Sequence, residues 1–171
     1  MQSIQITDFY SYSCQGEDWT AAFAAAIQTA SSLGGGTVYV PSGVYPSRSI
    51  ELLSHTALYL EAGAIIRFLD TIEAYDLIET ESEGRPVRCY KPLIFEDIAI
   101  RGQGTLNGNG GAWWEAQHSR TLTHGRPPML HFQHCQHICL EDITIRRSPF
   151  WTIHPLYCDD MLIRGVTIQN P

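Results

Sequence analysis

Apolar residues in this chain follow two different periods. Between residues 19 and 33 they recur at helical spacing, and one face collects Trp19, Phe23, Ala26, Ile27 and Ala30. Glu17 and Asp18 precede this segment as N-capping residues, and glycines at positions 34–36 end it. The pattern predicts an amphipathic helix over residues 18–33, about four turns long.

The rest of the chain alternates between apolar and polar positions in the manner of strands. TVYV from Thr37 alternates, and PSGVY then supplies a turn and another short extended piece. From residue 55 onward a pattern repeats, in which a short apolar strand, a polar or glycine turn and a second short strand follow one another. The four copies are HTALYLEAGAIIRF from His55, DIAIRGQGTLNG from Asp97, HICLEDITIRRSPF from His137 and DMLIRGVTIQNP from Asp160.

A third strand precedes each of the last three copies. These strands are LIF from Leu93, LHF from Leu130 and TIH from Thr152. Ile138 and Met161 are 23 residues apart, as are Cys135 and Cys158. Three short strands per repeat, with a period in the low twenties, are typical of a parallel β-solenoid, and the LxxLxLxxN pattern of leucine-rich repeats is absent. We therefore predict one all-β domain over residues 1–171, with Ile98, Ile138 and Met161 stacked inside it.

Both ends of a solenoid expose core and strand edges unless something covers them. The predicted helix over residues 18–33 is suited to cover the first coil as a capping helix. At the other end the strand-like run MLIRGVTI is followed by three residues and no cap. We therefore expect this chain to be the N-terminal part of a longer solenoid, truncated on its C-terminal side.

Composition narrows the class of protein. With 44% hydrophobic residues and 11% aromatics, the 171 residues fit a soluble globular protein. A net charge of −7 argues against nucleic-acid binding, and the longest apolar stretch, AAFAAAI, is too short for a membrane span. No signal peptide is visible and the five cysteines form no CxxC pair. We expect a cytoplasmic setting, or secretion if the natural start lies upstream, and no cofactor.

Several stretches, in order along nearly the whole chain, resemble the polygalacturonases, glycoside hydrolase family 28. They are GGGTVYVPSGVY, LYLEAGAII, IRGQGTLNGNGGAWW and RPPMLHFQHCQHICLEDITIRRSPFWTIHPLYCDDMLIRGVTI, within which GQGTLNGNGGAWW and SPFWTIH are the most specific. The resemblance implies a right-handed parallel β-helix that hydrolyses α-linked galacturonate in pectin or its oligomers. It also implies a metal-independent mechanism that inverts the configuration at the anomeric carbon. In that mechanism one aspartate protonates the leaving oxygen and others activate water.

The family's catalytic motifs, NTD-G-x-D, a paired DD, GHG and RxK, are absent from residues 1–171. Asn170 and Pro171 resemble the lead-in to the first motif, so the resemblance places the catalytic residues downstream of Pro171. We expect the segment alone to be inactive. Asp159 and Asp160 follow a cysteine, whereas the family's pair precedes one, and we interpret them as turn residues.

Four residues are candidates for binding the pectic substrate. If Ile153 points inward, alternation places Thr152 and His154 on the outer face, beneath the missing NTD-G-x-D strand, where the family has its cleft. Arg146 and Arg147 have the planar guanidinium that matches a galacturonate carboxylate. The alternative interpretation is a structural surface histidine and exposed turn arginines. Trp113 and Trp114 could likewise stack on a sugar or pack beneath the loop that follows them.

Other chemistry is less well supported by the sequence. The histidines of HFQHCQH match no zinc spacing, so we interpret them as solvated, with His131 pointing outward. GQGTLNGNGG lacks the Lys-Ser/Thr ending and the following helix of a phosphate loop. Two alternatives remain: a non-catalytic carbohydrate-binding or structural β-helix, and a lyase-like β-helix that would need calcium-binding carboxylates. Endo or exo action and the oligomeric state are not set by the sequence.

Overall fold

Three parallel sheets wind around one hydrophobic core in the described part of the chain. A computed structural model describes residues 2–82, 84–95 and 99–171. Sheet A contains β1 (Gln2–Gln5), β2 (Gly36–Val40), β5 (Thr56–Leu60), β10 (Ala99–Gly102), β13 (Cys139–Glu141) and β16 (Leu162–Arg164). Sheet B contains β3 (Gly43–Ser47), β6 (Ala64–Phe68), β11 (Thr105–Asn107), β14 (Thr144–Arg146) and β17 (Thr167–Gln169). Sheet C contains β4 (Ile50–Glu51), β9 (Ile94–Phe95), β12 (Leu130–Gln133) and β15 (Ile153–Leu156).

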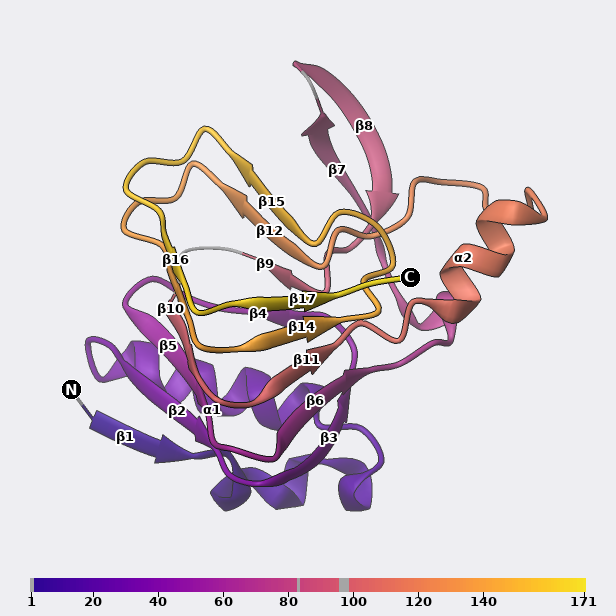
Figure 1. Cartoon of the computed structure of the whole chain (residues 1–171). Coiled ribbons are helices and arrows are strands. Elements are labelled where there is room, and N and C mark those ends of the chain that lie inside the picture. The colour runs from indigo at the N-terminus through magenta and orange to yellow at the C-terminus, as the bar shows by residue number, and fades with distance from the viewer. Residues whose placement is uncertain (1, 83, 96–98) are drawn as a thin grey trace.

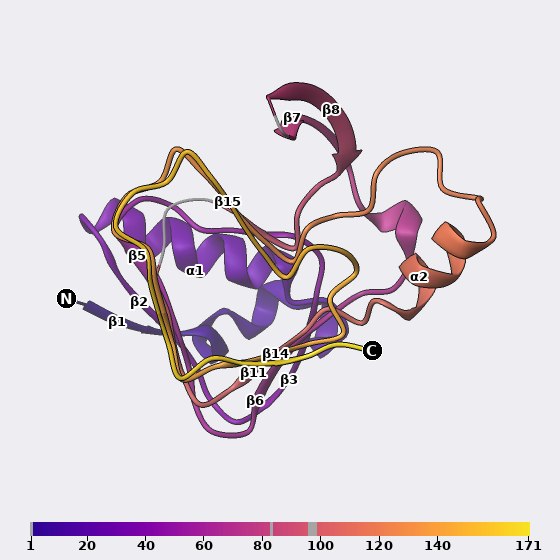
Figure 2. The ribbon, with the colours of Figure 1, turned by 45° about the horizontal axis from the view of Figure 1, so that its top comes forward.

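The sheets form the sides of a right-handed parallel β-helix (Figures 1 and 2). The last two coils lie in register at a spacing of 23 residues in all three sheets. The pairs are Cys139 with Leu162, Thr144 with Thr167 and Leu130 with Ile153. Ile138 and Met161 directly precede Cys139 and Leu162, so they lie one above the other in the register predicted for the stack of Ile98, Ile138 and Met161. The third member of that stack, Ile98, lies outside the described residues.

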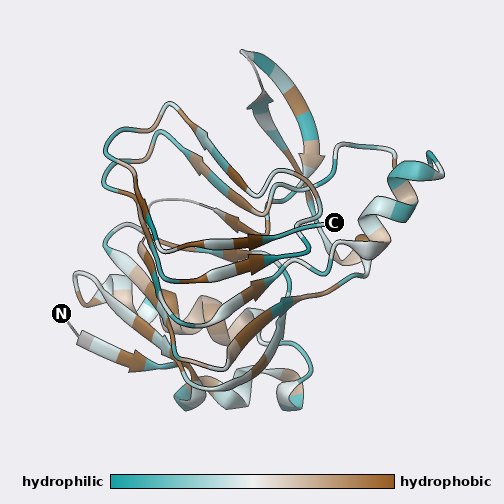
Figure 3. Cartoon of the chain, in the orientation of Figure 1, coloured by the Kyte–Doolittle hydropathy of each residue, from teal (hydrophilic) through white to brown (hydrophobic). Residues whose placement is uncertain are grey.

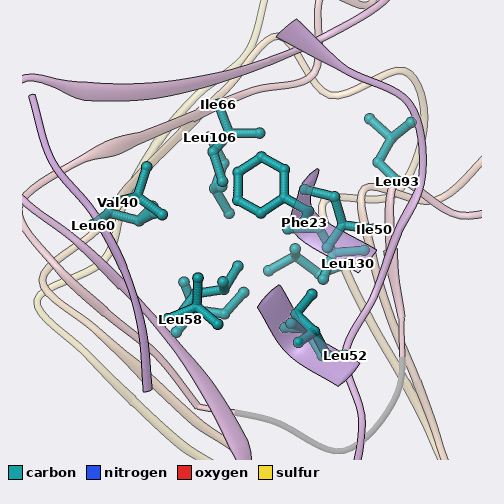
Figure 4. Close-up of a cluster of buried hydrophobic side chains, with 14 of the residues drawn as sticks. Phe23, Val40, Ile50, Leu52, Leu58, Leu60, Ile66, Leu93, Leu106 and Leu130 are labelled. Atoms are coloured by element: carbon teal, nitrogen blue, oxygen red, sulfur yellow. The ribbon is translucent and has the colours of Figure 1, made fainter. Parts of the chain in front are cut away.

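Like residues stack in columns inside the coils. In sheet A, Leu58 pairs with Val38 on one side and Ile100 on the other, and all three are fully buried. Figure 3 shows hydrophobic residues along the strands that enclose the core, and Figure 4 shows Leu58 and Leu106 pointing into the interior. On the last coil the inward columns of sheets A and B end in Ile163 and Ile168, which are exposed, and Leu162, in the neighbouring column of sheet A, is exposed as well.

One helix covers the first coil. This helix, α1 (Thr20–Ser32), lies within the predicted range 18–33 and buries Phe23 and Ile27 in the core. Figure 4 shows Phe23 among the core side chains. The carboxylate of Asp18 accepts a hydrogen bond from the backbone N–H of Thr20 at 2.9 Å, so it satisfies one of the free donors at the helix start. The preceding chain forms two short 3₁₀ helices, η1 (Ile6–Tyr12) and η2 (Cys14–Gly16).

Two elements outside the coils were not predicted. The antiparallel strands β7 (Leu77–Ser82) and β8 (Arg85–Tyr90) form a hairpin that is not part of the three parallel sheets (Figure 1). A second helix, α2 (Gly111–His118), begins at the last glycine of GQGTLNGNGG, so the expectation that no helix follows this loop is wrong. The helix forms because Trp113 is fully buried, with ring centroids 5.5 Å from Tyr75 and 5.0 Å from Tyr90. A short 3₁₀ helix, η3 (Ile72–Ala74), precedes the hairpin.

Among the described helices, none is both long enough and apolar enough to cross a membrane. The cytoplasmic setting stays a prediction.

Candidate functional site

The outer face of sheet C carries two histidines side by side. Strands β12 and β15 pair so that Leu130 lies against Ile153 and His131 against His154. Since Leu130 is fully buried in the core, strand alternation places both histidines on the opposite, outer face. Their Nδ1 atoms are 2.9 Å apart, which is hydrogen-bonding distance.

Burial keeps this imidazole pair uncharged. His131 is only 5% exposed, and burial, followed by the nearby His154, lowers its pKa to about 4. Burial also lowers the pKa of His154. Near neutral pH one Nδ1 therefore donates to the other as N–H. The expectation that His131 is solvated is wrong, although its side chain does point away from the core.

The hairpin β7–β8 is what buries His131. The Thr80 hydroxyl lies 3.4 Å from Nε2 of His131 and donates to the side-chain oxygen of Gln133 at 3.4 Å. A second attachment lies farther along the hairpin, where the hydroxyl of Tyr157 donates to the carboxylate of Glu81. The hairpin thus forms a wall along sheet C and is attached to both of the last two coils.

A row of stacked planar groups continues from the histidines along this face. We call it the ring row, and its members are His131, His154, Trp151, Phe150 and Arg126. Neighbouring ring centroids are 5.0, 4.3 and 4.4 Å apart, and the guanidinium of Arg126 lies 4.7 Å from the centroid of Phe150. Nη1 of Arg126 also donates to the carbonyl oxygen of Pro149 at 3.0 Å. These contacts join the members of the row, yet Trp151 and Phe150 are 39% and 37% exposed.

Two hollows adjoin the ring row. The first, about 200 Å³, lies beneath the hairpin and is bordered by residues that include Val87, Cys89, Pro92 and Pro128. The second, about 240 Å³, is bordered by Trp114, Ser148, Pro149, Asn170 and Pro171. Arg126, Phe150 and Trp151 border both, so these three residues separate two adjacent hollows on one face. This arrangement is suited to two consecutive units of a chain-like ligand that has both apolar and polar groups.

Comparison with known proteins identifies the family. A family model for the glycosyl hydrolases family 28 matches residues 37–171. The chain belongs to this family. Its sequence is 33% identical over 165 residues to a probable polygalacturonase of Vitis vinifera. That match covers 89% of this chain and 34% of the relative, so the chain spans about a third of the relative's length.

Solved structures of two exopolygalacturonases have the same fold. An exopolygalacturonase from Thermotoga maritima superposes with a TM-score of 0.83 at 26% identity, over 99% of this chain and 47% of that one. A family 28 exopolygalacturonase from Yersinia enterocolitica gives a TM-score of 0.84 at 18% identity, over 99% of this chain and 38% of that one. The parallel β-helix is therefore that of family 28.

The predicted binding residues of this family 28 chain lie in two places. His154 borders the first hollow, and the hydroxyl of Thr152 accepts a hydrogen bond at 2.8 Å from Asn170, which borders the second. Arg146 lies on β14 of sheet B, and the guanidinium of Arg147 lies 5.4 Å from the centroid of the Trp114 ring. Neither arginine is among the residues that border the hollows.

Sequence reasoning missed the contributions of Arg126, Phe150 and His131 to this face. Phe150 lies inside SPFWTIH, one of the most family-specific stretches, which was a usable signal. Arg126 lies in a loop without any local pattern. Within the described ranges, no three His, Cys, Asp or Glu side chains are grouped to hold a metal ion.

Proposed function

We propose that the outer face of sheet C binds a pectic poly- or oligosaccharide for a polygalacturonase-type glycoside hydrolase. The reaction is hydrolysis of α-linked galacturonate with inversion and without a metal, and residues after Pro171 supply the acid and water-activating aspartates. The observation that carries this proposal is the ring row between two adjacent hollows. Family membership and the polygalacturonase relatives support the substrate class.

Each part of the row matches a group on such a saccharide. The exposed apolar surface of Trp151 and Phe150 is suited to contact the C–H groups of a sugar ring. Arg126 has N–H groups beyond the one it donates to Pro149, and a guanidinium pairs well with a uronate carboxylate. Together the two hollows fall within the volume of small-molecule sites, roughly 300–1,000 Å³.

The described residues do not form the catalytic pair. An inverting glycosidase needs two carboxyl groups about 6.5–9.5 Å apart across the scissile bond. Of the described residues, Glu81 is the one carboxylate that borders either hollow, and it already accepts the hydrogen bond of Tyr157. Asp160 lies in an exposed turn, where its carboxylate is 3.3 Å from Nδ1 of His137. This chain's own residues therefore bind and orient the substrate.

The test is calorimetric binding of an oligogalacturonate to the chain and to Trp151→Ala. Losing one exposed stacking ring costs about 1 kcal/mol, so affinity should fall about fivefold. Tyr12→Ala is the matched control, because Tyr12 is a 55% exposed aromatic on η1, far along the chain from sheet C. Equal losses in the two variants, or no binding by the parent chain, would refute the proposal.

A non-catalytic carbohydrate-binding β-helix is the second candidate, because neither hollow is bordered by two carboxylates. The two functions are separated by assaying the natural gene product for release of reducing ends from polygalacturonate. Saccharide binding without hydrolysis by that protein would favour the second candidate.

A further inference from the structure

We propose that the first hollow, beneath the hairpin, binds a uronate unit as its uncharged methyl ester rather than as the free carboxylate. This inference rests on the proposed function and specifies which form of the pectic unit enters this hollow. Three observations support it: apolar walls, an uncharged floor that offers a hydrogen-bond acceptor, and a carboxylate at the rim.

The walls are apolar on both sides. Val87 and Cys89 alternate onto the same face of β8, and the prolines Pro92 and Pro128 lie among the bordering residues. Val and Pro side chains have no polar hydrogen to offer. Cys89 is buried, which raises the pKa of its thiol and keeps the thiol uncharged. A methyl group loses no hydrogen bonds when it is buried against such walls.

The floor is the imidazole pair, and its hydrogen bonds have a definite direction. The Thr80 hydroxyl gives its proton to Gln133, so its oxygen accepts from Nε2–H of His131. Nδ1 of His131 then carries a lone pair and accepts from Nδ1–H of His154. This leaves a lone pair on Nε2 of His154, for which the described residues provide no partner. A sugar hydroxyl of either form can donate to that atom, and neither a carboxylate nor an ester oxygen can. The full negative charge of a carboxylate facing this lone pair is less favourable than a neutral ester oxygen.

Three charged side chains border the hollow: Glu81, Arg88 and Arg126. The Glu81 carboxylate borders the hollow and would repel a second negative charge. Arg88 also borders it, but it is exposed and alternates onto the opposite face of β8 from Val87. Arg126 lies at the boundary with the second hollow, where its guanidinium covers Phe150 and donates to Pro149. Its charge is therefore placed to meet the carboxylate of the neighbouring unit.

The preference has an expected size. Burying the methyl group of the ester should raise the affinity about fourfold over the free acid, because that is the usual effect of removing one apolar carbon from water. Desolvating a carboxylate without a paired donor adds a further penalty for the free acid. We expect the ester to bind at least about tenfold more tightly.

The experiment titrates the 171-residue chain, near neutral pH, with methyl α-D-galactopyranosiduronate and with its methyl ester, followed by NMR. The parent should prefer the ester about tenfold or more. Val87→Lys places a cation in the wall and should reverse the preference. The control Val44→Lys changes a valine that is 51% exposed on β3 of sheet B, and it should keep the parent's preference. Circular dichroism verifies that each variant is folded.

Equal or tighter binding of the free acid by the parent overturns the inference, and so does failure of both monosaccharides to bind. The parent's ratio is decisive even if Val87→Lys does not fold. Oligogalacturonate binding that depends on Trp151, without any ester preference, would overturn this inference alone. Absence of oligogalacturonate binding would overturn the proposed function as well.

Discussion

Acid should destabilise the chain because the buried His131 resists protonation in the folded state, whereas the unfolded chain does not. Burial lowers the pKa of His131 from its ordinary 6.5 to about 4. Between these values the unfolded chain binds a proton that the folded chain does not. The free energy of unfolding is therefore unaffected by His131 above about pH 6.5 and decreases as the pH falls toward about 4. A tenfold change in proton affinity is worth about 1.4 kcal/mol, so the loss is about 3 kcal/mol. Because the side chain is only 5% exposed, solvent screening reduces this value little.

The assay is urea unfolding at about pH 7 and about pH 4, chosen to bracket the titration of His131. His131→Asn keeps a polar group near the position of Nδ1 and does not titrate. Its free energy of unfolding should therefore change by about 3 kcal/mol less between the two pH values than that of the parent. His118→Asn, an exposed substitution at the end of α2, is the control and should behave as the parent does. If His131→Asn retained the parent's full pH dependence, the assignment of a neutral buried pair would be wrong.

Two further predictions concern the stability of the coils, both measured by urea unfolding at neutral pH. Leu58→Ala should lower the free energy of unfolding by about 2–5 kcal/mol, because it opens a cavity in a fully buried column of side chains. Its control is Leu162→Ala, at a 49% exposed position in the same sheet, which should change the free energy of unfolding by less than about 0.5 kcal/mol. Gly102→Ala should also lower the free energy of unfolding. The backbone φ of +115° alone costs a non-glycine residue about 1–3 kcal/mol, and the new Cβ would in addition lie 2.1 Å from the carbonyl oxygen of Leu60. Gly34→Ala is the control, because φ is also positive there, at +82°, but no atom lies within 4 Å of the added carbon. If Gly34→Ala lowered the free energy of unfolding as much as Gly102→Ala, the steric argument would be wrong.

The coils could be predicted from the sequence because each is specified locally and repeated. A strand of three to five residues with a buried face needs only an apolar position at every second residue, and stacking requires similar residues one period apart. Leu140 and Ile145 satisfy both conditions, so the pairs of strands in sheets A and B were visible as a pattern. The helix that covers the first coil was visible because thirteen residues, Thr20–Ser32, are enough to show helical periodicity.

The hairpin and the second helix depend on distant contacts instead. LIETES and RPVRCY are mostly polar and contain a proline, because the hairpin is solvated on much of its surface. Helix α2 has eight residues, too few to show a period, and it is fixed by the burial of Trp113 against Tyr75 and Tyr90. Neither element could be recognised without the tertiary structure.

The same distinction applies to the candidate site. The outer placement of His154 followed from strand parity, a local property. The burial of His131 could not follow from it, because the covering residue, Thr80, is 51 positions away in the sequence. Arg147 was predicted from its charge alone, and the turn after β14, where its φ is +53°, brings it to Trp114 rather than to the hollows. Charge identifies a candidate, and backbone geometry decides where its side chain lies.

The stacking of coils in sequence order has a consequence for biosynthesis. Helix α1 and the first strands leave the ribosome before the later coils, so the covered end of the β-helix can form before them. Every later coil pairs with the one made before it, as β10 does with β5 and β13 with β10. Each newly emerged coil therefore finds a finished template with free N–H and C=O groups, and the order of translation matches the order of assembly.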